Sequence, residues 1–199
     1  MVPHLVLASA SPRRKELLER LGIRPEIRPA DIDETVRCGE RSDDYVRRLA
    51  TEKALALCEP GQLVIGADTS VVLDEQILGK PTDERHAVEM LRALSGRSHH
   101  VLTGVAVAYR SSAADLSRVH HDVGSTRVDF PELSDKRIEW YLSTNQSGDK
   151  AGSYGLNGAA SVFADAIEGS VTNVIGLPLP LLDSLVGRHG FDLVSFAEP

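Results

Sequence analysis

The segment Leu5–Leu18, close to the start of the chain, constrains the fold more than any other stretch. An apolar run, Leu5–Ala8, predicts a short buried strand, and the small residues after it predict a tight turn. Ser11 is a favourable N-cap, Pro12 suits the first position of a helix, and Gly22 is typical of a helix stop. A strand that passes through a short turn into a helix predicts an α/β protein.

Three cations, Arg13, Arg14 and Lys15, crowd the first turn of this helix, where the helix dipole is positive. Each is disfavoured there by about 0.3–1 kcal/mol, so their presence calls for a reason. Backbone N–H groups at a helix start, together with arginines that can fork onto oxygens, make a binding site for phosphate. The alternative is that these side chains simply extend into solvent.

The acidic balance of the chain limits its partners, because its 199 residues carry a net charge of −7. This charge argues against a general surface for nucleic acid or for an acidic membrane. Cys38 and Cys58 form neither a CxxC motif nor a disulfide framework, which favours a reducing compartment. With no signal peptide or membrane-length apolar run in view, we expect a cytoplasmic protein. No linker or repeat divides the chain, and we expect a single domain over residues 1–199.

Ser42 or Asp43 is expected to cap a second helix that runs to about Leu57, with apolar residues over one broad side. At about 100° per residue, Lys53 falls in the middle of that apolar side. A lysine in this position either extends its ammonium outward or meets a partner. Lys53 is therefore a candidate functional residue.

The next strand, Gln62–Ala67, is continuously apolar and is expected to end at Asp68 and Thr69. A strand buried on both faces is typical of the middle of an α/β sheet. Ligands meet such sheets at the carboxyl ends of the strands. Asp68 is therefore a second candidate, with the closing of a turn as its alternative role.

Periodicity and turn residues predict the remaining elements. They are a helix capped by Thr82–Asp83 and stopped by Gly96, strands over Val101–Tyr109 and Val119–Val128, a helix capped by Ser134, a hairpin of strands Ser161–Ile167 and Val171–Ile175, and a last helix opening at Leu177. The pairs His99–His100 and His120–His121 lie on or beside these strands and could meet across the sheet. They lack a recognised ligand spacing, so strand-end positions are favoured over a zinc site.

Five cations lie at element ends, on an apolar helix side or in glycine-bearing loops: Arg13, Arg14, Lys53, Lys80 and Lys150. A triphosphate is a ligand that gathers such a set. The carboxylates placed beside them are those of Glu34, Asp68 and Asp149, and one or two carboxylates with substrate phosphates suit a magnesium-type ion. The chain lacks Walker A, GxSxG and GxGxxG motifs. The residues alone thus predict a phosphate-binding α/β enzyme with a divalent cation.

Five motifs resemble the Maf family in sequence and in order. They are Leu7–Arg14 (LASASPRR), Gly66–Thr69 (GADT), Gly79–Pro81 (GKP), Asp149–Gly155 (DKAGSYG) and Gly176–Leu179 (GLPL). The resemblance spans essentially the whole chain. It implies a nucleoside triphosphate pyrophosphatase that releases a nucleoside monophosphate and pyrophosphate. It also implies a mixed twisted sheet with flanking helices and two lobes around a central cleft, a divalent metal cation (Mg²⁺ or Mn²⁺), and a homodimer.

The resemblance also implies roles for single residues. Asp68 matches the family's general base, which takes a proton from the water that attacks the α-phosphorus. The phosphate and metal site is lined by residues matching Ser9, Arg13, Arg14, Glu34, Lys53, Lys80 and Asp149. Glu34 and Asp149 from this set, together with Asp68, are expected to hold the metal, and Lys150 joins the substrate-binding residues.

The choice of base is implied by Arg13, Thr69 and Asn157, which match positions associated with base preference in the family. Arg13 and Thr69 are typical of the dTTP/UTP subgroup, which usually has glutamine where this chain has Asn157. Two alternatives stay open at this point. One is a regulator of septum formation without catalysis, and the other is the same chemistry on a methylated guanosine triphosphate.

Overall fold

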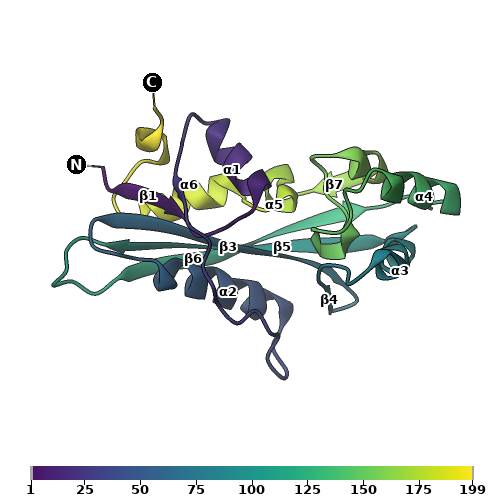
Figure 1. Cartoon of the computed structure of the whole chain (residues 1–199), viewed down its shortest axis with the longest axis horizontal. Coiled ribbons are helices and arrows are strands. Elements are labelled where there is room, and N and C mark those ends of the chain that lie inside the picture. The colour runs from purple at the N-terminus through teal and green to yellow at the C-terminus, as the bar shows by residue number, and fades with distance from the viewer. Residues whose placement is uncertain (1, 199) are drawn as a thin grey trace.

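The fold is a mixed α/β structure, seen in a computed structural model that describes residues 2–198 (Figure 1). Its seven-stranded sheet has the order β2-β1-β3-β5-β6-β7, and β4 pairs with β3 off this path. The strands are β1 (His4–Leu7), β2 (Glu26–Ile27), β3 (Gln62–Leu73), β4 (Gln76–Leu78), β5 (Ser98–Arg110), β6 (Arg118–Asp129) and β7 (Ala166–Glu168). Strand β1 is parallel to β2 and β3, whereas β3, β5, β6 and β7 pair antiparallel. The predicted mixed sheet is confirmed.

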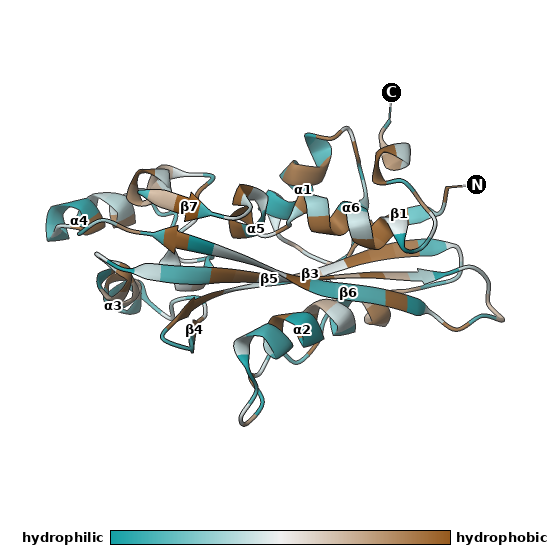
Figure 2. Cartoon of the chain, turned by 180° about the vertical axis from the view of Figure 1, so that it is seen from behind, coloured by the Kyte–Doolittle hydropathy of each residue, from teal (hydrophilic) through white to brown (hydrophobic). Residues whose placement is uncertain are grey.

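Helices cover both faces of this sheet. They are α1 (Pro12–Glu19), α2 (Ser42–Ala56), α3 (Glu84–Leu94), α4 (Asp135–Ser143), α5 (Val171–Ile175) and α6 (Leu179–Gly187). Helices α1, α5 and α6 lie on one side of the central strands, and α2 lies on the other (Figure 1). The central part of β5 is largely apolar, whereas much of β6 and the outer end of α4 are hydrophilic (Figure 2). No helix among residues 2–198 is both long and apolar enough to cross a membrane.

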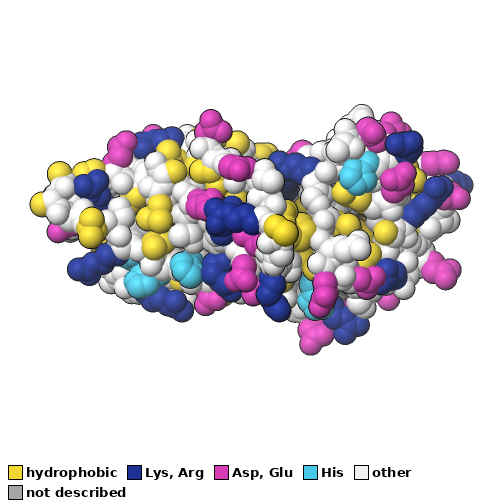
Figure 3. Space-filling model, turned by 90° about the horizontal axis from the view of Figure 1, so that it is seen from below, with side chains coloured by type: hydrophobic (Ala, Val, Ile, Leu, Met, Phe, Trp, Pro, Cys, Tyr) yellow, Lys and Arg dark blue, Asp and Glu magenta, His cyan; other side chains and the backbone are white. Residues whose placement is uncertain are grey.

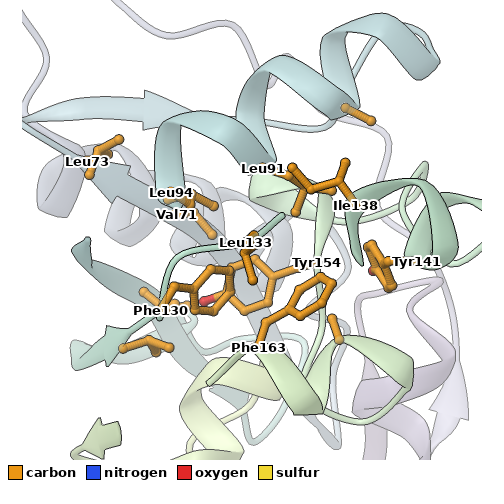
Figure 4. Close-up of a cluster of buried hydrophobic side chains, with 14 of the residues drawn as sticks. Val71, Leu73, Leu91, Leu94, Phe130, Leu133, Ile138, Tyr141, Tyr154 and Phe163 are labelled. Carbon is orange, nitrogen blue, oxygen red and sulfur yellow. The ribbon is translucent and has the colours of Figure 1, made fainter. Parts of the chain in front are cut away.

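The buried side chains form separate clusters at the two ends of the long strands. At one end, residues of α1 and α6 such as Leu18 and Leu185 pack on Leu63 and Ile65 of β3. At the other end, residues of α3 and α4 pack around Phe130, as Figure 4 shows. Strands β3 and β5 pass through both ends, and the molecule is accordingly elongated (Figure 1). This arrangement agrees with the expected two lobes.

Two glycines let α2 lie unusually close to the sheet. A Cβ atom on Gly66 would come within 2.1 Å of the carbonyl oxygen of Ala50, and one on Gly104 within 2.1 Å of that of Val46. Any larger residue at either position would push the helix away. Because side chains alternate along a strand, Asp68 faces the same side of β3 as Gly66. The close packing of α2 therefore brings Lys53 over Asp68.

The predicted end of the central strand at Asp68 is wrong, because β3 continues to Leu73. Its ladder with β5 runs on through Asp68, opposite Gly104, and Thr69, opposite Thr103. Two polar residues do not end a strand whose partner continues beside it. The strand that does end close to Asp68 is β1, which stops at Leu7 opposite Ile65 of β3.

A gap in the sheet edge follows from this topology. On the side of β3 away from β5, β1 pairs with residues Gln62–Ile65 and β4 with Val71–Leu73. Between these two pairings, no strand of the described chain covers residues 66–70. Asp68 lies at the middle of this uncovered edge, and side chains from both ends of the molecule can reach it.

The predicted hairpin over residues 161–175 is also wrong. A 3-10 turn spans Ala159–Phe163, the strand is limited to β7, and Val171–Ile175 is helix α5. The side chain of Ser170 accepts a hydrogen bond from the backbone N–H of Asn173, which starts the helix despite its β-branched residues. A local cap therefore outweighs residue propensity here.

Candidate active site

A cavity of about 580 Å³ opens at the uncovered edge of β3. Its lining includes every residue proposed from the sequence as part of the site: Ser9, Arg13, Arg14, Glu34, Lys53, Asp68, Thr69, Lys80, Asp149, Lys150 and Asn157. These residues come from the β1–α1 turn, the loop before α2, α2 itself, β3, and the loops after β4 and α4. Segments distant in sequence thus meet at one cleft, as expected.

Lys53 joins two carboxylates at the floor of the cavity. Its Nζ atom lies 2.8 Å from Oδ1 of Asp68 and 2.7 Å from Oε1 of Glu34. The Lys53 side chain is only 10% exposed and that of Asp68 13%, so this pair is shielded from water. The lysine on the apolar side of α2 therefore does meet a partner.

The charge around Glu34 favours its ionised form. Partial burial alone raises the pKa of its carboxyl, but the hydrogen bond and charge of Lys53, with the charges of Lys80 and Arg14, bring the pKa below its usual value. Lys80 contributes through its charge, since no ion pair of its own is found within residues 2–198. Glu34 is thus a carboxylate at neutral pH.

Asp149 lies on the other side of the cleft and is paired with cations. Its Oδ2 atom is 2.7 Å from Nη1 of Arg13, and its Oδ1 atom is 2.6 Å from Nζ of Lys150. Burial alone raises the pKa of this carboxyl, but the hydrogen bonds from Lys150 and Arg13 outweigh it and lower the pKa to about 2. Lys150 also donates to the carbonyl oxygen of Gln146 at 2.5 Å. The ion pair between Arg13 and Asp149 joins the start of α1 to the loop after α4.

Arg14 is bound mostly by the protein itself. Its Nε donates to the carbonyl oxygen of Gly176 at 2.8 Å, and Nη1 donates to Ser9 Oγ at 2.9 Å and to the carbonyl oxygen of Ala67 at 3.0 Å. Its Nη2 donates to Thr69 Oγ1 at 3.0 Å. One of its five N–H groups is left without a partner among residues 2–198. Arg14 therefore supports the cavity wall and has little left to offer a substrate directly.

The loop that carries Glu34 has no regular structure and is held by α2. Tyr45 Oη donates to the carbonyl oxygen of Glu34 at 2.9 Å, and Arg48 Nη2 donates to that of Thr35 at 3.1 Å. Arg48 also binds both carboxylate oxygens of Glu40, at 2.6 and 2.8 Å. The side chains of Arg48 and Glu40 are only 12% and 9% exposed, so the pair is well shielded.

Sequence analysis missed Tyr45 and Arg48 as site residues. Tyr45, Leu49 and Lys53 are spaced four residues apart, so they share one side of α2. A tyrosine two turns before the candidate lysine was the signal that could have revealed the cavity-lining position of Tyr45. Arg48 offered no such signal, because its partners lie in a loop whose path the sequence does not determine.

The carboxylates fit a divalent cation in part. Magnesium is usually held by one or two protein carboxylates together with substrate phosphates, and Glu34 and Asp68 converge on one point at Lys53. Asp149 instead faces two cations. Among residues 2–198, no three metal-binding side chains converge on their own. The donor set therefore suits an ion that takes its other ligands from phosphate oxygens.

The two histidine pairs do not meet. His99 lies opposite Val128, whereas His120 lies opposite Val107, far along the same ladder. His99 is buried, with its Nε2 atom 2.6 Å from the hydroxyl oxygen of Tyr154. The zinc alternative across the sheet is thus contradicted by the strand register.

A family model described as Maf-like protein matches residues 4–189. A dTTP/UTP pyrophosphatase of Anaeromyxobacter dehalogenans strain 2CP-1 is 51% identical over 193 residues, which cover 97% of each chain. Proteins of the same description from Myxococcus xanthus strain DK1622 and Shewanella sp. strain MR-7 are each 47% identical. The alignments cover 95% of this chain and 94% of the Myxococcus protein, and 94% of this chain and 98% of the Shewanella protein.

Proposed function

Because the chain belongs to the Maf family, we propose that it is a nucleoside triphosphate pyrophosphatase. It hydrolyses the α–β bond of dTTP and UTP and releases a nucleoside monophosphate and pyrophosphate. Relatives about half identical over nearly the whole chain, all described as dTTP/UTP pyrophosphatases, support this assignment. It rests further on one feature of the site, the shielded Asp68–Lys53 pair, which Glu34 joins inside a cavity lined with cations.

In the reaction that we propose, a water molecule attacks the α-phosphorus. Asp68 accepts its proton, the new P–O bond forms, and the bond to the bridging oxygen breaks so that pyrophosphate leaves. Arg13, Lys80 and Lys150 hold the triphosphate and offset the charge that develops on the leaving group. Lys53 orients Asp68, since its ammonium already holds one carboxylate oxygen.

A divalent cation is part of the proposal. Glu34 and Asp68 would hold it together with phosphate oxygens, and Asp149 would join them when substrate draws Arg13 and Lys150 away. The ion supplies positive charge that stabilises the phosphate oxygens. We propose Mg²⁺ or Mn²⁺, the ions that suit oxygen ligands.

We propose further that the protein works in the cytoplasm as a homodimer, with residues 1–199 forming one Maf-like domain. Nucleic acids and membranes are not among its expected partners. The net charge of −7 supports this, as does the face shown in Figure 3, where basic and acidic side chains are interspersed.

Hydrolysis in water enriched in heavy oxygen tests the reaction. The attacked phosphorus keeps the oxygen of water, so label is expected in the nucleoside monophosphate. Label in pyrophosphate would mean attack on the β-phosphorus, and label in orthophosphate would mean removal of the γ-phosphate. Either result overturns the mechanism. A panel of nucleoside triphosphates with product identification measures the base preference, and no turnover of any of them would favour a purely regulatory role.

A further inference from the structure

The outer edge of β6 is free over most of its length. Strand β7 pairs with β6 only at Arg127–Asp129, and the hydroxyl of Thr126 bonds to the backbone of Ser170. Within residues 2–198, no strand pairs with the preceding segment 118–125 on the side away from β5. In Figure 2, β6 lies between α6 above it and α2 below it, so the two faces of the strand are covered. The edge between them is not.

The direction of the backbone groups along this edge follows from the ladder with β5. Phe130, directly after β6, donates its N–H to the carbonyl oxygen of Arg97 at 3.0 Å, in line with the register of the ladder. Even-numbered residues of β6 therefore direct their backbone groups toward β5, and odd-numbered residues direct them outward. The outward groups belong to Val119, His121, Val123 and Ser125. Among the described residues only the N–H of Val123 has a partner, Asp122 Oδ1 at 2.9 Å. Such an edge is a template for another strand.

The side chains along this edge suit a second copy of the same strand. Two antiparallel copies related by a two-fold axis pair odd-numbered with odd-numbered residues, because only these present outward backbone groups. With the axis at His121, Val119 lies opposite Val123 of the second copy, and His120 lies opposite Asp122 of the second copy. Both pairs are favourable across an antiparallel ladder, and each occurs twice. The Val123 N–H then bonds to the second copy, which frees the Asp122 carboxylate for His120.

The two neighbouring registers place like groups opposite each other. With the axis at Asp122, the two Asp122 carboxylates face each other, which is destabilising. With the axis at His120, the ring of His120 meets its own copy. Each His120 already packs on His189, with ring centroids 4.5 Å apart, so four imidazoles would crowd together. The register centred on His121 is therefore favoured.

We infer that two copies of this chain pair through the outer edges of β6, antiparallel around a two-fold axis at His121, and form one continuous sheet. This inference rests on the homodimer of the proposed function and gives that dimer a surface. Strand β5 separates β6 from the uncovered edge of β3, where the cavity opens. Pairing through β6 therefore leaves both cavities open to substrate.

Complementary charge variants test this surface. His120→Asp sets two carboxylates opposite each other, and Asp122→Lys removes the acceptor of His120. Each should weaken dimerisation at least about tenfold, because the change acts at both symmetry-related contacts. An equal mixture of the two variants should form a heterodimer, since one contact then joins opposite charges and the other is the native pair. The double variant His120→Asp/Asp122→Lys should again form a homodimer. In the register centred on His120, the double variant would bring like charges together and stay monomeric.

A backbone variant tests the same edge without changing these charges. His121→Pro removes an outward N–H at the axis, and proline is tolerated on an edge strand whose N–H faces outward, so the ladder with β5 is kept. This variant should be monomeric. The control is Asp135→Lys, which reverses a 72% exposed acidic side chain on α4 and should dimerise like wild type.

Sedimentation equilibrium gives the dimer dissociation constant of each protein, and thermal unfolding shows that each is folded. A monomeric wild type overturns the inference, as do unchanged dimers in the single variants and His121→Pro, or a monomeric double variant. UTP hydrolysis is measured separately. His120→Asp and Asp122→Lys should hydrolyse UTP within about twofold of the wild-type rate, because surface substitutions away from the site have small effects. Failure of the wild type to hydrolyse any nucleoside triphosphate overturns the proposed function and leaves the dimer surface standing.

Discussion

The Nζ atom of Lys53 lies 2.8 Å from Oδ1 of Asp68, although 15 residues and a change of element separate the two. The contact depends on the close approach of α2 to β3 that Gly66 allows. Since Lys53 also binds Glu34, one ammonium group links the helix, the central strand and the preceding loop.

Asp68→Asn should lower kcat by roughly 10²-fold or more, because it removes the proposed base. The amide oxygen can still accept from Lys53, so the fold should be retained. Pyrophosphate release gives the rate, and thermal unfolding gives the control for stability. Near-normal turnover by a folded variant would transfer the base role to Glu34 or Asp149.

Arg13→Ala should weaken substrate or transition-state binding by a few kcal/mol, as for other charge-assisted contacts left unmade. The stability should change little, because the Asp149 partner is 60% exposed and a cation at a helix start is unfavourable. Lys15→Ala is the matched control, since Lys15 follows on the same helix and is 51% exposed. Steady-state kinetics measure the loss of binding, and melting temperatures measure the change in stability. An Arg13 variant that unfolds yet binds normally would make Arg13 structural.

Arg48→Met should lower kcat/KM by about tenfold, because the loop that carries Glu34 is then held by fewer contacts and Glu34 is less well placed. Glu40→Gln should have a smaller effect in the same direction, since the amide keeps one acceptor for Arg48. Arg41→Ala is the control, because Arg41 precedes the same helix with its side chain 80% exposed. Equal kinetics for Arg48→Met and Arg41→Ala would remove Arg48 from any positioning role.

Buried His99 should make stability depend on pH. Burial lowers its pKa from 6.5 to about 4, so in mild acid the unfolded chain binds a proton that the folded chain does not. Protonation then favours unfolding, and stability falls as the pH drops from about 6.5 to 4, by at most about 3 kcal/mol. Urea unfolding at several pH values should show this slope in wild type and in His100→Gln but not in His99→Gln. The same slope in His99→Gln would assign it to other groups.

Asn157→Gln should sharpen the preference for dTTP and UTP. Asn157 is exposed in the loop that lines the cavity, and its carboxamide is one methylene shorter than the glutamine usual in that subgroup. A carboxamide too short to complete its hydrogen bond to the base leaves a polar group unpaired, which costs about 1–3 kcal/mol. The preferred base then has a smaller advantage over the other bases. The measurement is kcat/KM over a nucleotide panel for both proteins. A wild-type preference of tenfold or more for a purine triphosphate would contradict the subgroup.

Local physical chemistry determined much of the fold directly from sequence. Side chains of Asp83 and Ser134 cap α3 and α4 as expected, by accepting from the N–H groups of His86 and Arg137. Lys53 lies on the buried side of α2, as the helical period requires. Ser11 occupies the N-cap of α1 but makes no capping bond with its side chain. The N-cap of α2 is Arg41, so the predicted cap at Ser42 or Asp43 is wrong. Periods and caps involve residues within one or two turns, so the sequence carries most of this information.

Only the tertiary structure decided which of the site residues pair with one another. Sequence placed Asp149 with the metal ligands, yet in the structure it binds Arg13, 136 residues away, and Lys150. The same holds for Asp68, predicted at a strand end and found within one because β5 continues alongside. The hydrogen bonds that join the hydroxyl of Thr69 to that of Thr103, and Thr103 to the carbonyl oxygen of Asn173, likewise link segments far apart in the sequence. Residue type and the period of a helix or strand can be recognised from neighbouring positions in the sequence. The contacts between site residues depend instead on strand register and helix packing, which bring distant segments within hydrogen-bond distance.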